Sequence, residues 1–252
     1  MRITEGSVAE EPAGMATASI RSGWSYLSET IYKTAKTHMK NLVTFFSILL
    51  LLSSCSGTMQ GQNSDGWISL FDGKSLNGWK ASENPATFSV EDGKIVVHGP
   101  RAHLFYVGPV QDANFKNFEL KTRVMTTPGS NSGIFIHTAY QEDGWPSQGY
   151  EVQVNNSHTD WRRTGSLYAV DDVKDVFVKD NEWFTEHIIV QDNKITIKIN
   201  DKTVVEYTEP AEVAQAQGEI GKRLSSGTFA LQGHDPKSKV YYKEVLVKPL
   251  PE

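Results

Sequence analysis

Hydrophobic and polar residues alternate with a period of two along most of the chain after residue 66. This period places successive side chains on opposite faces of a β-strand. Each alternating stretch is short and bounded by Gly, Pro, Asn or Asp, which favour turns. Many short strands with frequent turns predict an all-β fold, an antiparallel sandwich or jelly roll. The predicted strands are Thr87 to Val90, Lys94 to His98, His103 to Val107, Phe118 to Met125, Gly133 to Thr138, Tyr150 to Val154, Glu186 to Gln191, Lys194 to Asn200, Lys202 to Tyr207, Gly227 to Gln232 and Val240 to Val247.

Turn sequences join several of these strands into predicted hairpins. Glu91-Asp92-Gly93, Asp192-Asn193 and Asn200-Asp201 each separate two alternating segments. A short helical turn is expected only at Pro210 to Gln217, which is rich in Ala, Glu and Gln and is followed by Gly. We find no internal repeat, and residues 67 to 252 are predicted to form one domain.

Three consecutive strands separate an apolar face from a polar, partly aromatic one. Because these strands follow one another along the chain, we expect them to be neighbours in one sheet. Glu, Gln, Asn, His and Phe together suit a carbohydrate, whereas the alternative is a polar face that is simply solvated. The residues of this second face are Glu119, Lys121, Arg123, Phe135, His137, Glu151, Gln153 and Asn155.

An apolar run from Leu42 to Leu52 follows Lys40 and ends just before Cys55. At 1.5 Å per residue this run is too short to cross a bilayer core of ~30 Å, and its flanks are typical of a secretory signal. The sequence Leu52-Ser53-Ser54-Cys55 resembles the lipobox of bacterial lipoproteins. The resemblance implies a lipid anchor on Cys55 as the one membrane contact, and a location in the cell envelope, in the periplasm or at the outer membrane. The alternative is a free, buried cysteine.

The position of Met39 suggests where translation begins. A signal of ordinary length would start there, so we hypothesise that residues 1–38 reflect a misassigned start and that 39–54 are the lipoprotein signal. Residues 55–66 are small and polar, which is typical of a flexible tether, and the folded domain follows at 67–252.

Composition and motifs argue against several classes of function. The chain has 25 Lys+Arg and 30 Asp+Glu, a formal charge of −5, so no nucleic-acid partner is expected. A single cysteine allows neither an intrachain disulfide nor a Cys-based zinc site. No metal-ligand spacing of histidines or phosphate-binding glycine loop occurs, so we expect no metal and no cofactor. A structural calcium held by backbone carbonyls stays open, as does the oligomeric state.

A conventional glycosidase needs two carboxylates beside the scissile bond. The residue two positions after Glu151 is Gln153, so the strand does not supply the usual pair. Glu119, from another strand, is the alternative partner.

Five segments of the chain form an ordered set of motifs: Leu70 to Trp79, Asn131 to Ile136, Gly149 to Val154, Gly165 to Tyr168 and Leu231 to His234. Taken in order, they resemble the 3-keto-disaccharide hydrolase family over residues 67 to 250. The resemblance implies a concanavalin A-like (laminin G-like) β-sandwich that is exported and acts on glycosides oxidised at carbon 3. Two features depart from the family pattern: Lys243-Glu244 stands where an Arg-Asn pair is common, and the loop from Asp235 to Lys239 is longer than usual.

Chemistry at a 3-keto sugar requires acid/base groups rather than a carboxylate pair. The ketone acidifies the proton on carbon 2, so a base can remove it and the aglycone can leave carbon 1 by elimination before water adds. We expect Glu151 and His234 to transfer protons, with His137 as an alternative. The candidate substrate contacts are Asn131, Gln153, Tyr168, Gln232, Lys243, Arg123 and Trp145. Rival hypotheses are a non-catalytic carbohydrate-binding module and a conventional glycosidase.

Overall fold

The computed structural model describes residues 65–212 and 221–252, all of which lie within one compact unit. The predicted signal, Cys55 and residues 213–217 of the expected helical turn lie outside the described residues. Within the described ranges no helix is long and apolar enough to span a bilayer. The strands are β1 (Ile68–Ser69), β2 (Trp79–Ala81), β3 (Phe88–Glu91), β4 (Lys94–Val97), β5 (Ala102–Tyr106), β6 (Phe118–Thr126), β7 (Ser132–Thr138), β8 (Tyr150–Val154), β9 (Phe184–Gln191), β10 (Lys194–Ile199), β11 (Lys202–Thr208), β12 (Thr228–Gly233) and β13 (Val240–Pro249), with short 3₁₀ turns at Pro85–Thr87 and Val110–Ala113.

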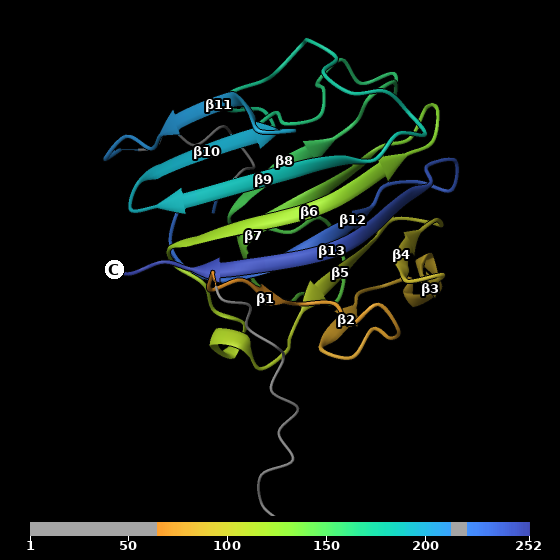
Figure 1. Ribbon diagram of the computed structural model, residues 1–252, viewed down its shortest axis with the longest axis horizontal. Helices are drawn as coiled ribbons and strands as arrows, with labels where there is room; N and C mark the ends of the chain where they lie inside the picture. The colour runs from red at the N-terminus through yellow and green to blue at the C-terminus, as the bar shows by residue number, and fades with distance from the viewer. Residues whose placement is uncertain (1–64, 213–220) are drawn as a thin grey trace, which may run out of the picture. The chain divides into compact units, whose positions relative to one another are not determined.

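These strands form two antiparallel sheets (Figure 1). The larger sheet has the order β11-β10-β9-β6-β13-β4-β3, and β1 pairs with β13. The smaller sheet has the order β2-β5-β12-β7-β8. The predicted all-β antiparallel sandwich is therefore confirmed.

The three predicted hairpins are present, because β3 pairs with β4, β9 with β10 and β10 with β11. The eleven predicted strands all occur, with ends that differ by at most two residues. The sequence did not indicate β1 and β2, which are two and three residues long and too short to show a period of two.

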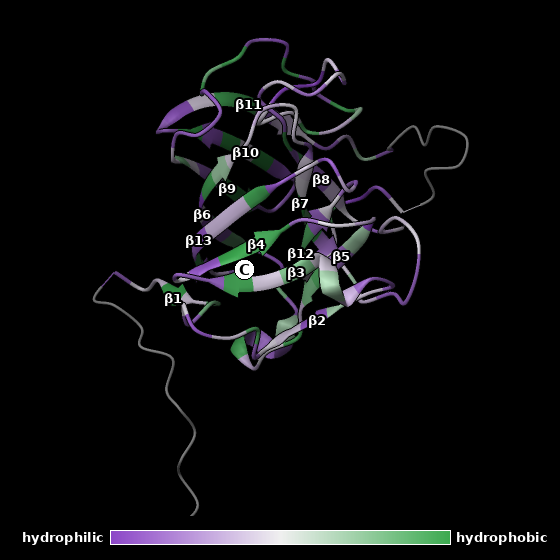
Figure 2. Cartoon of the chain, turned by 90° about the vertical axis from the view of Figure 1, so that its right-hand side faces the viewer, coloured by the Kyte–Doolittle hydropathy of each residue, from purple (hydrophilic) through white to green (hydrophobic). Residues whose placement is uncertain are grey.

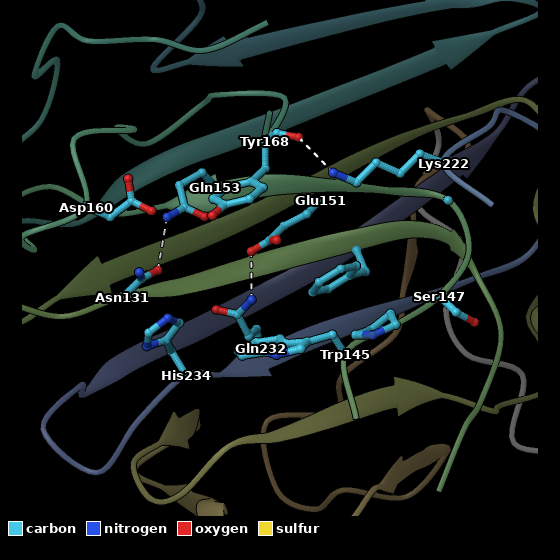
Figure 3. Close-up of a pocket in the computed structure, with 13 residues that line it drawn as sticks. Asn131, Trp145, Ser147, Glu151, Gln153, Asp160, Tyr168, Lys222, Gln232 and His234 are labelled. Carbon is cyan, nitrogen blue, oxygen red and sulfur yellow. Dashed lines mark hydrogen bonds between the residues drawn. The ribbon is translucent and has the colours of Figure 1, made fainter. Parts of the chain in front are cut away.

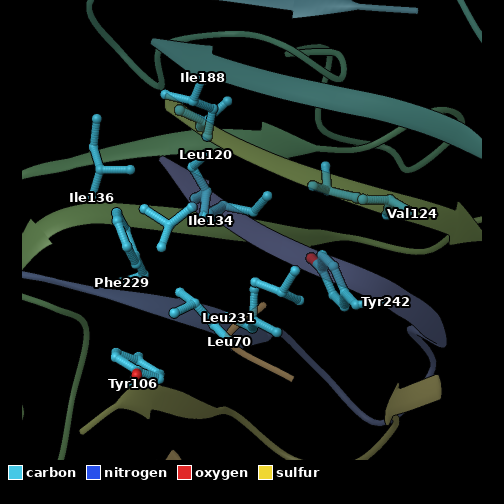
Figure 4. Packing of buried hydrophobic residues seen from close by; sticks show 14 of the residues in the cluster. Leu70, Tyr106, Leu120, Val124, Ile134, Ile136, Ile188, Phe229, Leu231 and Tyr242 are labelled. Carbon is cyan, nitrogen blue, oxygen red and sulfur yellow. The ribbon is translucent and has the colours of Figure 1, made fainter. Parts of the chain in front are cut away.

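The inner faces of the two sheets pack against each other and form the hydrophobic core (Figure 4). Leu120 of β6 and Ile188 of β9 come from the larger sheet, and Ile134 of β7 and Leu231 of β12 from the smaller one. Fully burying such a side chain contributes roughly 1.5–3 kcal/mol each. Figure 2 shows hydrophobic residues mainly in the strands, where they are interspersed with hydrophilic ones, and hydrophilic residues in most loops.

One expectation about strand neighbours is wrong. β6 lies within the larger sheet, between β9 and β13, whereas β7 and β8 are adjacent in the smaller sheet. The chain crosses from one sheet to the other between β6 and β7. Elements that are consecutive along a chain usually pair, but a sandwich also contains such crossings.

The segment before β2 has a structural role. The Asp72 carboxylate accepts hydrogen bonds from the amides of Lys74 and Ser75, and Gly73 adopts φ +73°. The Trp79 indole is buried and donates to the Leu70 carbonyl at 2.7 Å. These contacts fix the start of the domain against the core.

Candidate active site

A cavity of about 450 Å³ lies on the outer face of the smaller sheet (Figure 3). This volume lies in the range of small-molecule binding sites. Side chains of β7, β8 and β12 form its floor, and loops supply its walls. The cavity is lined by Asn131, Phe135, Trp145, Pro146, Ser147, Gly149, Glu151, Gln153, Asp160, Tyr168, Lys222, Gln232 and His234.

Strand alternation positions the floor of the cavity. Val152 and Ile134 point into the core, so Glu151, Gln153 and Phe135 point to the opposite face. Gly133 pairs with Gln153 across the β7–β8 ladder. A Cβ atom on Gly133 would lie 2.9 Å from Glu151 Cγ and 3.0 Å from Cδ. The Glu151 carboxyl group can therefore lie above β7 because residue 133 is a glycine and has no side chain.

The carboxyl group of Glu151 is held in a weakly solvated position. Its Oε1 atom accepts a hydrogen bond of 2.7 Å from Gln232 Nε2. Burial raises the pKa of Glu151 to about 7, although the Gln232 bond and the charge of Lys222 favour ionisation. A carboxyl group with a pKa near neutrality can both accept and donate a proton.

Two side-chain amides beside Glu151 each present an unused acceptor. Gln153 Nε2 donates to Asn131 Oδ1 at 3.1 Å, and Gln232 Nε2 donates to Glu151. The Oε1 atoms of both glutamines are buried and have no hydrogen-bond partner among the described residues. Because an unpaired buried acceptor is costly, a ligand with hydroxyl donors would stabilise this floor.

Aromatic rings form part of the cavity wall. Trp145 is 46% exposed, and its ring contacts His103 and His234 at centroid distances of 5.5 and 5.7 Å. Tyr168 lies on the opposite side of Glu151 in Figure 3, and its ring contacts the Arg162 guanidinium at 4.6 Å. An exposed aromatic face such as that of Trp145 can pack against a sugar ring.

His234 follows β12 at the edge of the cavity. Its Nδ1 atom is 2.8 Å from Asp235 Oδ2, and its ring lies 5.4 Å from that of His158. The structure thus brings His234 and Glu151 to the same cavity, together with the predicted Asn131, Gln153, Gln232, Tyr168 and Trp145.

Two charged loop residues in the cavity were not among the predicted site residues. Lys222 follows the predicted helical turn, and its Nζ atom donates to the Tyr168 carbonyl at 3.5 Å. Asp160 lies in the loop after β8 and pairs with Arg162 at 3.6 Å. Loop residues follow no periodic pattern, so the sequence could not indicate that these two side chains lie at the same cavity as the strand residues.

Arg123 and Lys243 do not lie at the cavity, contrary to expectation. They are register partners on β6 and β13 of the larger sheet, and Lys243 Nζ lies 4.3 Å from the Trp183 ring. The expected role of Lys243 followed from the sequence motif, and that of Arg123 from placing β6 beside β7. Glu119 also belongs to β6 and bonds to His187 at 2.8 Å, so it cannot pair with Glu151.

His137 also differs from expectation, for a local reason. It has φ +52°, and the β7–β12 register shifts beside it, which interrupts the alternation of side chains. Its ring packs against Phe118 of the core and bonds to the Lys116 carbonyl at 2.9 Å. His137 therefore supports loops behind the sheet rather than lining the cavity.

One cluster among the described residues could offer ligands to a metal ion: His158, His234 and Asp235. The Asp235 carboxylate already accepts bonds from His234, Ser238 and the amide of Lys237. His158 Nδ1 accepts the amide of Asp160 at 3.1 Å. Because the Asp235 oxygens and the Nδ1 atoms of both histidines are engaged in hydrogen bonds, we interpret the cluster as a hydrogen-bonded network, and the absence of a catalytic metal stays a prediction.

Fold and cavity together define an antiparallel β-sandwich protein with a polar cavity, partly lined by aromatic rings, on the outer face of its smaller sheet. The family model of the 3-keto-alpha-glucoside-1,2-lyase-like domain matches residues 66–248 of the sequence, so the chain belongs to this family. A 3-keto-disaccharide hydrolase of Bacteroides thetaiotaomicron is 30% identical over 177 residues, which cover 58% of this chain and 59% of that protein. The chain therefore spans about three fifths of the length of this relative.

Solved structures support the same fold. A Parabacteroides distasonis protein provisionally described as a glycosyl hydrolase has a TM-score of 0.63 at 26% identity, covering 75% of this chain and 96% of that one. The exoplasmic/lumenal domain of VIP36 in its Ca²⁺/Man-bound form has a TM-score of 0.51 at 10% identity, covering 75% and 92%. The second likeness concerns the fold alone.

Proposed function

We propose that the domain cleaves glycosides whose sugar carries a ketone at carbon 3, by elimination followed by hydration. The observation that carries the proposal is the Glu151 carboxyl group, whose pKa is raised to about 7 in a cavity that also holds His234. The family supports the substrate class, since its name refers to 3-keto-glucoside lyases.

The reaction needs proton transfers at carbon 2 and at the oxygen atoms that leave and enter at carbon 1. A base removes the proton from carbon 2, and the electron pair passes into the ketone to form an enolate. When the ketone re-forms, a double bond joins carbons 1 and 2, and the aglycone oxygen leaves carbon 1 with a proton from an acid. Water then adds its oxygen to carbon 1, and carbon 2 regains a proton. Glu151 and His234 supply these transfers in our proposal.

Other cavity residues suit the remaining requirements. The positive charge of Lys222 acts to lower the pKa of Glu151, which shows that it acts at the position of this carboxyl group. The same charge would stabilise the negative charge of the enolate. The unpaired Oε1 atoms of Gln153 and Gln232 would accept sugar hydroxyl groups. Trp145 and Tyr168 would flank the ring.

A conventional glycosidase is the second candidate, because Asp160 supplies another carboxylate in the cavity. The Asp160 carboxylate is, however, committed to the Arg162 side chain at 3.6 Å and to the Arg162 amide at 3.0 Å. These two contacts hold the Asp160 carboxylate against Arg162. A binding module would need neither Glu151 nor His234 as a proton carrier.

We also propose that the protein is a lipoprotein of the bacterial cell envelope, anchored through Cys55. The apolar run before Leu52-Ser53-Ser54-Cys55 supports this proposal. Metabolic labelling with a radioactive fatty acid should mark the wild type and not a Cys55→Ala variant. Equal labelling of both proteins would contradict it.

The activity can be tested with a 3-keto-glucoside and its unoxidised parent, following release of the aglycone. We expect release from the keto-glucoside only, and a loss of at least about 10²-fold in Glu151→Gln. Equal release from both glycosides would favour the conventional glycosidase. Binding without release from either would favour the binding module.

A further inference from the structure

The loop after β12 is organised around a single carboxylate, that of Asp235. Its Oδ1 atom accepts the amides of Lys237 at 2.8 Å and Ser238 at 3.2 Å. Its Oδ2 atom accepts the Ser238 hydroxyl at 2.8 Å and lies 2.8 Å from His234 Nδ1. Oδ1 therefore stabilises the turn through two backbone amides, whereas Oδ2 contacts both the Ser238 hydroxyl and His234.

These bonds decide which nitrogen of His234 carries the proton. Burial opposes ionisation of Asp235, but hydrogen bonds from His234, Ser238 and the Lys237 amide outweigh it and lower the pKa of Asp235 to about 2. An ionised carboxylate can only accept hydrogen bonds, so His234 Nδ1 must donate. In a neutral imidazole the lone pair then lies on Nε2.

The same carboxylate is connected to the cavity floor. The Ser238 hydroxyl, which donates to Asp235, accepts the backbone amide of Asn131 at 2.9 Å. Asn131 precedes β7 and holds Gln153 through its own side chain. The rings of His158 and Trp145 contact His234 at 5.4 and 5.7 Å and limit its rotation.

We propose that Asp235 is a positioning residue that holds His234 in the Nδ1–H tautomer, so that Nε2 is the proton acceptor at the cavity. The catalytic part of this inference rests on the proposed function, whereas the tautomer itself does not. Asp235 occurs in the loop that is longer than usual in the family, so sequence resemblance alone did not single it out.

Two substitutions of Asp235 separate this role from a purely structural one. In Asp235→Asn the amide oxygen can still accept the turn amides, while Nδ2 would donate to His234 Nδ1 and force the proton onto Nε2. In Asp235→Ala the turn loses its acceptor, but His234 can adopt either tautomer. We therefore expect kcat on a 3-keto-glucoside to fall about 10²-fold or more in Asp235→Asn, and less in Asp235→Ala, with KM changed less than about threefold in Asp235→Asn.

A structural role predicts the opposite order, because Asn preserves the turn better than Ala. Thermal unfolding of both variants measures that contribution separately. Ser238→Ala is the matched control: it removes the hydroxyl and leaves the Asp235–His234 bond, so we expect a loss of kcat below about tenfold. A smaller loss in Asp235→Asn than in Asp235→Ala would overturn the proposal.

Nitrogen-15 NMR of the imidazole rings tests the tautomer without any turnover. We expect the His234 signals of the wild type at neutral pH to show Nδ1–H, and those of Asp235→Asn to show Nε2–H. A wild-type signal that shows the proton on Nε2 would overturn the proposal. Activity that EDTA abolishes and a divalent cation restores would also overturn it, because that result would make the cluster of His158, His234 and Asp235 a metal site. If the tautomer is as expected but no 3-keto-glucoside is cleaved, the proposed function fails and the assignment of the hydrogen bond stands.

Discussion

Replacing Gly133 with Ala should strongly reduce activity while leaving the fold intact. The new Cβ would lie 2.9 and 3.0 Å from Glu151 Cγ and Cδ, and nearer still to Oε1. Carbon atoms pack at about 3.5–4.0 Å, so the carboxyl group must retreat by roughly 0.5–1 Å. This shift would break the 2.7 Å bond from Gln232. A displacement of about 1 Å can lower a rate about 10²-fold, and we expect that loss in kcat/KM on a 3-keto-glucoside.

The stability of this variant should hardly change. Gly133 lies within β7, has no positive φ, and the clashing atoms belong to a side chain that can move. Replacing Gly with Ala in a strand gains about 0.5–1 kcal/mol from backbone entropy, which offsets the crowding. The control is Glu151→Ala, which lacks the Cγ, Cδ and Oε1 atoms that the new methyl group would meet. Adding Gly133→Ala to Glu151→Ala should change neither the residual activity nor the Tm. Single-variant activity within about threefold of the wild type would refute the steric argument.

Three further predictions concern charge and the cavity wall. The pKa of Glu151 rises from an ordinary 4.5 to about 7 on folding, so the wild type loses stability as pH rises through this interval. In urea unfolding, Glu151→Gln should therefore be more stable than the wild type by up to about 3 kcal/mol at pH 8 and by almost nothing at pH 4. Glu186 is fully buried, and burial raises its pKa well above the usual range, so the protein loses stability as pH rises. Glu186→Gln should therefore raise the Tm at alkaline pH without reducing kcat. An unchanged Tm at alkaline pH would contradict this prediction. Trp145→Ala should raise KM about tenfold with a smaller change in kcat, and an unaltered KM would show that the ring does not contact the substrate.

The sequence predicted the local part of this structure well. Alternation placed Glu151 and Gln153 on the face opposite Val152, and the structure confirms that face. The turn sequences identified the hairpins because the residues that form a turn are adjacent in the chain. The sequence resemblance also indicated the family and the fold.

The remainder depends on contacts between distant residues. Pairing of β6 with β9 and β13, rather than with β7, follows from packing of the whole sandwich, so Arg123 was assigned to the wrong sheet. His137 departs from the alternation because its backbone turns to φ +52°. Lys222 reaches the cavity from a loop, where side-chain direction has no period to reveal it.

The most direct test of the proposed elimination is deuterium incorporation at carbon 2. A 3-keto-glucoside is incubated with the full-length protein in D₂O, and the released keto-sugar is analysed at early times by mass spectrometry, with the free keto-sugar alone as the control for uncatalysed exchange. Elimination and hydration predict one deuterium at carbon 2 in each product molecule, above the control, and no release of product by Glu151→Gln. Product released without deuterium at carbon 2 would show direct displacement at carbon 1 and contradict the account.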